Sequence, residues 1–303
     1  MVKMLTKAEI QLIRSLGDKK GRSAEELFVA EGAKLVTELA SGMEIASPLK
    51  VRRVLCTETG AEHFEEVLRT VQRRNDSCDR KGNVPGKNIG TVGTVGVAGT
   101  TGCGMQGAGR WNDTPEVISH KEMERISFLK TPSDMLALVE IPRYRLSVRE
   151  LSDTLSLALD GVQDPGNMGT ILRLADWFGM RDVICSETTA DCFNPKVVQA
   201  TMGAIARVRV HYVPLARWLG EVRAAGIPVY GTFLDGEPIY DAALSPGGVI
   251  VMGSEGQGVS PEVAELVSRR LFIPPFPVGE PTSESLNVAT ATAIVCSEFR
   301  RRG

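Results

Sequence analysis

The first half of the chain mixes helical and strand patterns. Apolar residues recur at helical spacing between residues 8 and 16 and between 28 and 39, and a short basic turn at 17–22 separates the two segments. Further elements are expected in this half: strands at 51–56 and 135–139, and a helix at 119–128. These segments predict a mixed α/β domain within residues 1–145.

From residue 154 onward, short apolar runs alternate with helical patterns. The runs that predict strands lie at 155–159, 182–185, 208–213, 229–234, 249–252 and 271–273. The patterns that predict helices lie at 168–178, 195–204, 215–225 and 286–299, with a further helix start at Ser260. Such alternation indicates a parallel sheet covered on both faces, so a second α/β domain is expected over residues 154–303. Residues 142–152 are expected to link the two domains.

Residues 75–112 fit neither pattern. From residue 90 to 109 the chain is rich in Gly, Thr and Val, and ordering so many glycines costs much backbone entropy. The segment contains Gly102-x-Gly104-x-x-Gly107, which resembles a dinucleotide fingerprint, but the helix that must follow such a fingerprint is not predicted. We therefore expect a low-complexity insert without a nucleotide-binding role.

Composition and charge narrow the class of protein. The chain is 43% apolar and 24% charged, has no apolar run of about 18 residues, and begins without the apolar core of a secretory signal. Its six cysteines form no C-x-x-C pair and its three histidines are scattered, so we expect no metal, no disulfide framework and a reducing, cytoplasmic location. Residues 1–150 hold 23 Lys and Arg against 20 Asp and Glu, whereas residues 151–303 hold 12 against 17. The first half is therefore the better candidate surface for a polyanion.

Three loops follow predicted strands of the second half, at the edge where open α/β sheets bind ligands. The first loop opens the helix that contains Arg173, and Asn167 is expected to cap that helix. An arginine within an otherwise apolar helix is expected to be buried or to face a cleft, which suggests recognition of a phosphate or a carboxylate.

The second and third loops add further polar candidates. Residues 253–258 read G-S-E-G-Q-G and place Glu255 among glycines that let a ligand approach the backbone. Ser285 and Asn287 precede the last predicted helix, after a stiff proline-rich segment at 273–279 that suits a flat aromatic group such as adenine. Glycine turns and capping residues are common, so each loop alone is equally compatible with a structural role.

The order and spacing of the three motifs, N-x-G-x-x-x-R, G-S-E-G-x-G and S-L-N-V, resemble those of SpoU/TrmH-type enzymes of the SPOUT superfamily. The resemblance spans residues 154–303, and three shorter segments also fit it: 164–165, 178–179 and 202–204. Residues 28–32 and 131–132 resemble, more loosely, the ribosomal-protein-like substrate-binding domain of that family. The insert at 75–112 is not part of the family pattern.

The resemblance implies an S-adenosyl-L-methionine-dependent RNA ribose 2′-O-methyltransferase. It implies a C-terminal parallel-sheet domain with a trefoil knot, which forms a homodimer whose two subunits complete the active site. Residue matching assigns the cofactor pocket to Thr232, Gly253, Gly258, Ile273 and Leu286. It assigns the polar groups that orient Arg173 and the ribose to Asn167, Glu255, Ser285 and Asn287.

Several alternatives stay open at this point. In the family the arginine that matches Arg173 is proposed as a base, but a guanidinium keeps its proton unless its site strongly disfavours the cation, so Arg173 would otherwise hold a phosphate and orient the 2′-hydroxyl. Ribosomal RNA is favoured over tRNA, because the N-terminal domain suits a large structured RNA. The cations considered for phosphate contacts are Lys19, Lys20, Arg22, Lys50, Arg52 and Arg53. A non-catalytic RNA-binding or ribosome-assembly factor on the same fold is the second interpretation.

Overall fold

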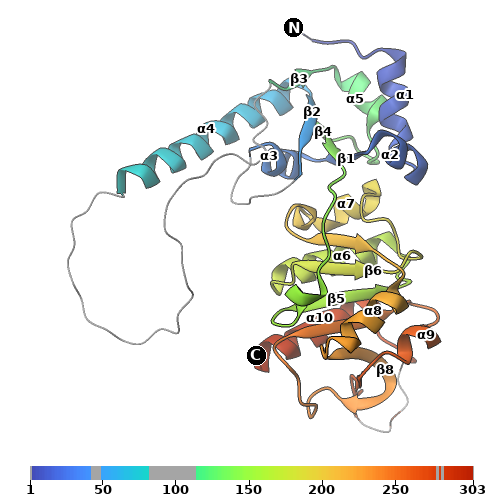
Figure 1. Cartoon of the computed structure of the whole chain (residues 1–303). Coiled ribbons are helices and arrows are strands. Elements are labelled where there is room, and N and C mark those ends of the chain that lie inside the picture. Colours follow the sequence, from blue (N-terminus) through green and yellow to red (C-terminus); the bar gives the residue numbers. More distant parts are fainter. Residues whose placement is uncertain (1, 42–48, 82–113, 278–279, 281–282, 303) are drawn as a thin grey trace.

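The computed structural model describes residues 2–41, 49–81, 114–277, 280 and 283–302 (Figure 1). The glycine-rich segment at 90–109 lies outside these residues. Residues 75–81, expected to belong to the insert, instead end the long helix α4 (Glu58–Lys81). This stretch holds neither glycine nor proline, so nothing in it stops the helix.

The N-terminal region is built on a four-stranded mixed sheet. Its order is β1 (Leu27–Glu31), β4 (Met135–Glu140), β2 (Val51–Cys56) and β3 (Glu116–Val117), with β4 antiparallel to both of its neighbours. Apolar residues of α1 (Lys7–Ser15) and α5 (His120–Ile126) pack on one face of this sheet, and those of α3 (Ala33–Ser41) and α4 pack on the other. The mixed α/β domain expected from the sequence is present.

Two expectations for this region are wrong. Residues 28–39 do not form one helix, because 28–31 belong to strand β1 and the helix α3 begins only after Gly32, whose φ is +117°. The apolar run Phe28-Val29-Ala30 is buried on both faces of the sheet. Over so few residues, the pattern of such a strand cannot be distinguished from that of a buried helix. The basic turn at 17–22 is also replaced, over most of its length, by the helix α2 (Lys19–Glu25).

The C-terminal region is built on a six-stranded sheet in which every pair of neighbours is parallel. The order across the sheet is β10 (Arg269–Phe272), β8 (Val229–Pro238), β9 (Gly248–Gly253), β5 (Leu155–Asp160), β6 (Asp182–Cys185) and β7 (Arg209–Tyr212). The parallel-sheet architecture expected from the alternation is therefore confirmed. The trefoil knot stays a prediction.

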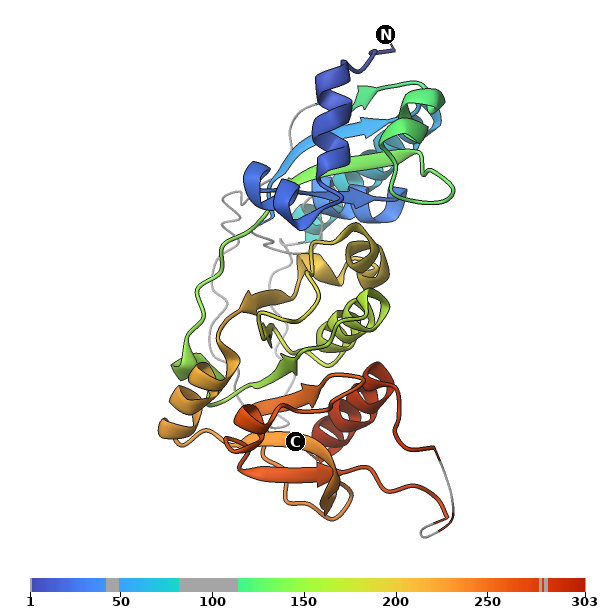
Figure 2. The same cartoon turned by 90° about the vertical axis from the view of Figure 1, so that its right-hand side faces the viewer.

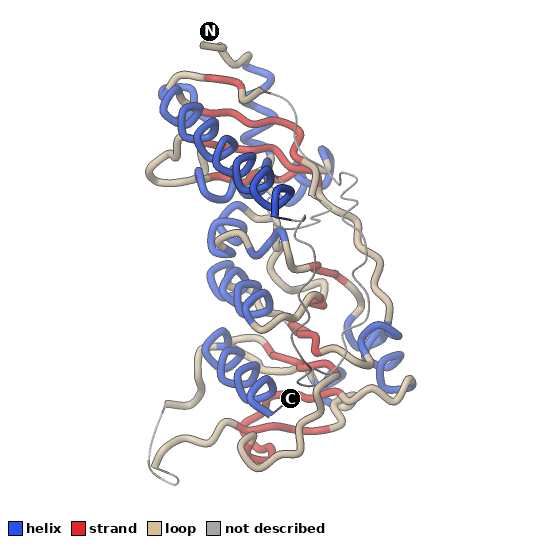
Figure 3. Tube along the Cα trace, turned by 90° about the vertical axis from the view of Figure 1, so that its left-hand side faces the viewer, coloured by secondary structure: helices blue, strands red, loops and turns tan. Residues whose placement is uncertain are grey.

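Helices cover both faces of this sheet (Figure 3). The helices α6 (Pro165–Trp177), α7 (Pro195–Thr201) and α10 (Val288–Arg302) pack with Leu155, Leu157 and Leu159 on one face. The helices α8 (Leu215–Ala224) and α9 (Pro261–Ala264) pack with the opposite face. The two 3₁₀ helices are η1 (Val148–Leu151) and η2 (Ala204–Ala206).

The two regions share one apolar core. Buried residues of the N-terminal sheet, α7 and the C-terminal sheet form a single continuous cluster. Figure 2 shows α7 at the top of the C-terminal region, facing the N-terminal region, and α7 contacts β1. Within the described residues, no helix is both long and apolar enough to cross a membrane.

Candidate functional site

Three loops at the carboxyl edge of the C-terminal sheet meet through one chain of hydrogen bonds. Asn167 donates from Nδ2 to Oε1 of Glu255 at 2.8 Å and accepts at Oδ1 from Nδ2 of Asn287 at 2.9 Å. These three residues come from the three sequence motifs. The structure therefore brings together three of the five polar side chains expected at the site.

The start of α6 explains why the Asn167 side chain is available. Asp164, not Asn167, caps this helix: its Oδ1 accepts from the backbone N–H of Asn167 at 2.8 Å. The expectation that Asn167 is the cap is wrong, because an acceptor at position 164 already satisfies the free N–H of the first turn. The Asn167 amide is consequently free to bridge the other two loops.

Asn287 has two roles at the start of α10. Its Oδ1 accepts from the backbone N–H groups of Ala289 and Thr290 at 3.0 and 3.2 Å, which caps the helix. Because the oxygen is engaged in this way, the Nδ2 group faces Asn167. The amide orientations along the chain are therefore mutually consistent, with each nitrogen facing an oxygen.

The loop that carries Glu255 is a tight glycine turn after β9. Ser254 and Gly258 pair through two backbone hydrogen bonds of 2.9 and 3.0 Å, and Gly258 has a φ of +70°. A Cβ on Gly253 would lie 2.1 Å from the backbone carbon of Gly258, so only glycine fits there. Glu255 is exposed at the tip of this turn.

Two of the expected polar residues lie apart from this chain. Arg173 is exposed rather than buried, and it forms no hydrogen bond or ion pair with the residues that the structure describes. Ser285 is also exposed and is not bonded to any of the described site residues. Arg173 lies six residues beyond Asn167, about 9 Å along the same helix. Its guanidinium is therefore available to an anion from outside the chain.

Three of the residues expected to bind the cofactor lie on, or directly after, three neighbouring strands. Thr232 is on β8, Gly253 ends β9, and Ile273 directly follows β10, and β8 lies between the other two strands. Thr232 and Ile273 are half-buried, whereas Leu286 is 50% exposed. The topology therefore places three of these five positions at one edge, and Gly258 lies in the turn that follows β9.

Asp160 is a site-forming residue that sequence reasoning missed. It ends β5, is buried, and accepts from the backbone N–H of Ser260 at 2.7 Å. This bond ties the chain after the Glu255 turn to the strand that leads into α6. The available signal was the position of Asp160 at the end of an apolar strand.

The cations expected to contact phosphate have different surroundings. Lys19, Lys20 and Lys50 are exposed, whereas Arg22 is 2% exposed and pairs with Asp191, so the expectation for Arg22 is wrong. A buried guanidinium already bonded to a carboxylate is not open to RNA. Lys19 also lies 5.9 Å from the ring centre of Tyr212.

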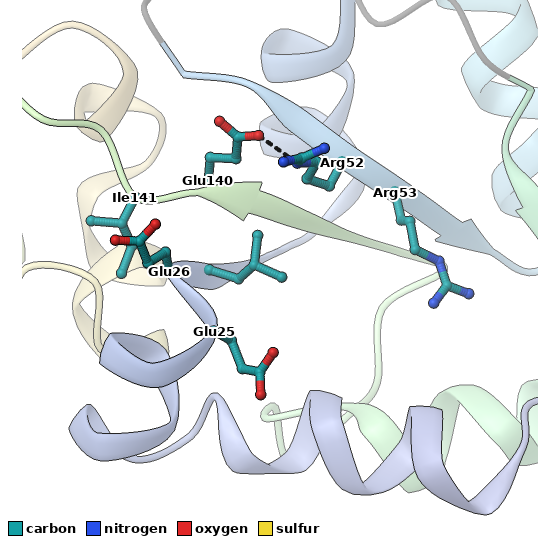
Figure 4. A pocket seen from close by; sticks show the side chains of 7 residues that line it. Glu25, Glu26, Arg52, Arg53, Glu140 and Ile141 are labelled. Atoms are coloured by element: carbon teal, nitrogen blue, oxygen red, sulfur yellow. Dashed lines mark ion pairs between the residues drawn. The ribbon is translucent and has the colours of Figure 1, made fainter.

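Arg52 and Arg53 border a cavity of about 440 Å³ in the N-terminal region. Figure 4 shows the side chains of Arg52 and Glu140 directed toward each other, and these two form an ion pair. Arg53 donates to Glu116, which holds the pKa of that carboxyl below its usual range. The two arginines are therefore partly neutralised, and the cavity is separate from the loops that carry Asn167, Glu255 and Asn287.

Among the described residues, no group of three His, Cys, Asp or Glu side chains is arranged to hold a metal ion. The polar chain at the carboxyl edge is instead an array of amide and carboxylate groups beside an exposed arginine. Such an array can orient a hydroxyl group and an adjacent phosphate.

Comparison with known proteins identifies close counterparts. The model of the SpoU rRNA Methylase family matches residues 154–297. The 23S rRNA (guanosine(2553)-2′-O)-methyltransferase RlmP of Bacillus subtilis is 32% identical over 185 residues, which cover 61% of this chain and 71% of that protein. The 23S rRNA (guanosine-2′-O-)-methyltransferase RlmB of Neisseria meningitidis is 36% identical over 150 residues, which cover 49% of this chain and 58% of that protein.

Two solved structures resemble the whole chain. A putative RNA methyltransferase of the TrmH family from Porphyromonas gingivalis has a TM-score of 0.73 and 37% identity, covering 99% of this chain and 100% of that one. An AdoMet-bound rRNA methyltransferase from Sinorhizobium meliloti has a TM-score of 0.70 and 26% identity, covering 99% and 97%. The chain therefore belongs to the SpoU rRNA methylase family, with a further α/β domain ahead of the matched region.

Proposed function

We propose that this chain transfers a methyl group from S-adenosylmethionine to a ribose 2′-hydroxyl of ribosomal RNA. The observation that carries the proposal is the hydrogen-bonded chain of Glu255, Asn167 and Asn287, because it joins the three family motifs at one edge of the sheet. The names of RlmP and RlmB, both 23S rRNA guanosine-2′-O-methyltransferases, support the choice of ribosomal RNA.

The residues expected on and directly after β8, β9 and β10 are compatible with the cofactor. A Cβ on Gly256 or Gly258 would meet nothing within 4 Å, so the backbone of this turn is open to a ligand. Half-buried Ile273 offers apolar surface for a base, and strand ends offer backbone donors and acceptors. Thr232, Gly253, Gly258, Ile273 and Leu286 would hold S-adenosylmethionine. When bound, the cofactor supplies an electrophilic methyl group on a sulfonium centre.

The chain's own side chains would place the acceptor. Arg173 would hold an RNA phosphate and orient the neighbouring 2′-hydroxyl, because a guanidinium has five donors in a planar fork and no acceptor. Asn167, Glu255, Asn287 and Ser285 would position the ribose. Holding two reactants in the right geometry is a large part of the rate gain in such a transfer.

The two regions of the chain would have different functions. Residues 154–303 would form the catalytic domain, and residues 1–145 would bind the RNA substrate through exposed cations such as Lys19, Lys20 and Lys50. RNA binding that rests on phosphate contacts weakens steeply as salt rises. We assign the enzyme to the cytoplasm, where ribosomal RNA and reduced cysteines would be found together.

The active enzyme would be a homodimer through the C-terminal domain. Trp177 is 85% exposed on α6, one turn beyond Arg173, and Leu286 is half-exposed near the start of α10. A large exposed indole beside a site residue is typical of an interface. Sedimentation analysis of the wild type and of Trp177→Glu would give a dimer and a monomer, respectively.

Methyl transfer from labelled S-adenosylmethionine to total ribosomal RNA and tRNA tests the proposal. The RNA is taken from cells that lack this protein, and the labelled nucleotide is mapped by its resistance to alkaline cleavage. Label at one ribosomal site supports the proposal, and label in tRNA would show that the substrate is tRNA instead of ribosomal RNA. Binding of the cofactor with no label in ribosomal RNA, tRNA or isolated subunits would favour a non-catalytic assembly factor.

A further inference from the structure

One guanidinium connects the N-terminal region of the chain to the helix that carries Arg173. Arg207, directly after η2, donates from Nε to both carboxylate oxygens of Asp176 on α6, at 2.9 and 2.8 Å. Its Nη1 donates to the carboxylate of Glu38 on α3. Arg207 therefore holds one carboxylate from each region of the chain.

A second contact fixes the same two regions at a different place. The buried Arg22 donates from Nε and Nη2 to Oδ2 of Asp191, at 3.0 and 2.5 Å, and from Nη1 to two backbone carbonyls of its own region. Beside this pair, the ring centres of Phe28 and Phe193 lie 4.8 Å apart. Two separate anchors and a shared core hold the N-terminal region in a single orientation on the C-terminal region.

The helix α6 is held at both ends by different partners. Asn167, in its first turn, is bonded to Glu255 and Asn287 of the catalytic loops. Asp176, in its last turn, is bonded to Arg207. Arg173 lies between them, three residues and about 5 Å before Asp176. A displacement of the last turn would consequently move Arg173 as well.

We propose that Arg207 is a positioning residue, which sets the place of Arg173 relative to RNA held by the N-terminal domain. This inference rests on the proposed function, because it assumes that RNA contacts both regions of the chain. Substitution of Arg207 would remove the guanidinium that donates to both carboxylate oxygens of Asp176. The loss of this ion pair would then loosen the contact at the end of α6.

The experiment compares Arg207→Gln, Glu38→Gln and the double variant in the full chain. Arg217→Gln is the matched control, because Arg217 pairs with Glu221 on the surface of α8, away from the bridge. Two quantities are measured: kcat and KM for RNA methylation, and the rate of trypsin cleavage at the exposed linker residues Arg143 and Arg145. The affinity for S-adenosylmethionine serves as the check on the fold.

We expect Arg207→Gln to lower kcat about tenfold and to speed linker cleavage several-fold, with cofactor affinity within about twofold of wild type. Glu38→Gln should have a smaller effect, since Arg207 still holds Asp176. The double variant should lose less than the product of the two single losses, because Glu38 and Arg207 share one ion pair. Arg217→Gln should match the wild type in every readout.

The inference would be overturned by unchanged linker cleavage in Arg207→Gln, by unchanged kcat, or by losses that multiply in the double variant. A parallel loss of cofactor affinity and kcat would also overturn it, because general unfolding rather than positioning would then explain the effect. A wild-type chain that methylates no RNA would refute the proposed function instead. Linker cleavage would still decide whether Arg207 joins the two regions.

Discussion

Asn287 donates from its Nδ2 to the Oδ1 of Asn167, which lies 120 positions earlier in the chain, at 2.9 Å. The same side chain caps the last helix through its oxygen. The cap thus fixes the orientation of an amide that belongs to the hydrogen-bonded chain of Glu255, Asn167 and Asn287. Stability of the helix and geometry of the site depend on one residue, and substitutions can separate the two roles.

Asn287→Asp should keep the helix cap and lose the hydrogen bond to Asn167. A carboxylate accepts from the N–H groups of the first turn as well as an amide does, so the melting temperature should stay within about 2 °C of wild type. The new carboxylate oxygen cannot donate to the Oδ1 of Asn167, so two acceptor oxygens would face each other. We expect methyl transfer to fall about 100-fold. Asn194→Asp, at the cap of α7, is the control, and equal activities of the two variants would contradict this view.

Arg173→Lys should abolish most activity without affecting stability. Arg173 is exposed and unpaired within the described residues, and substitutions at such positions usually change stability by less than about 0.5 kcal/mol. Lysine keeps the charge but lacks the planar fork that binds a phosphate with two donors. Methylation assays and thermal melting measure the two effects, with Arg181→Lys as the control. Retention of more than about half the activity would exclude both roles considered for Arg173.

Gly253→Ala and Gly256→Ala should differ sharply although they lie in the same turn. The Cβ at position 253 would meet the backbone of Gly258 at 2.1 Å, whereas the Cβ at position 256 would meet nothing within 4 Å. We expect the first variant to lose at least about tenfold in affinity for S-adenosylmethionine and several degrees in melting temperature. Calorimetric titration of both variants tests this, and tolerance of alanine at position 253 would show that the turn adapts.

Glu9 should stabilise the N-terminal domain in a pH-dependent way. A hydrogen bond from the Thr6 backbone, aided by the Thr6 hydroxyl, Lys3 and Arg53, lowers the pKa of Glu9 from 4.5 to about 2. Because the folded pKa is depressed, the stabilisation is complete above pH 4.5 and is lost as pH falls toward 2. Glu9→Gln should therefore destabilise the protein by about 1 kcal/mol at pH 7, and this difference should shrink below pH 4.5.

Denaturant unfolding at a series of pH values measures the effect of Glu9. Glu62→Gln, at an exposed position on α4, is the control. A difference between wild type and Glu9→Gln that stays constant from pH 7 to pH 3 would show that the carboxylate charge does not contribute.

Much of the C-terminal architecture is readable from the sequence. The strand expected at 182–185 agrees with β6 at both ends, because the apolar run is bounded by charged and polar residues. The family resemblance is confirmed, and it rests on the spacing of motifs that end neighbouring strands. In contrast, strand β1 was expected as a segment of a helix, since its pairing with β4 joins residues more than 100 positions apart.

The partners of single side chains were harder to predict. Nothing local distinguishes Arg22 from its neighbours Lys19 and Lys20, yet only Arg22 is buried, because its partner Asp191 belongs to the other region of the chain. The capping propensity of asparagine predicts Asn167 as the cap of α6, whereas Asp164, three residues earlier, accepts the hydrogen bond. The burial of Arg22 depends on a tertiary contact and the choice of cap on a local one, and residue type alone predicts neither.

The apolar core shared by the two regions has a consequence for engineering. Cutting the chain in the linker would leave residues such as Phe193 and Val197 without the partners that now cover them, so the excised C-terminal region would expose an apolar surface. Attaching a different RNA-binding domain would therefore require a matching surface opposite α7, whatever the length of the linker. The RNA-binding role proposed for the N-terminal region therefore could not be exchanged as an independent module.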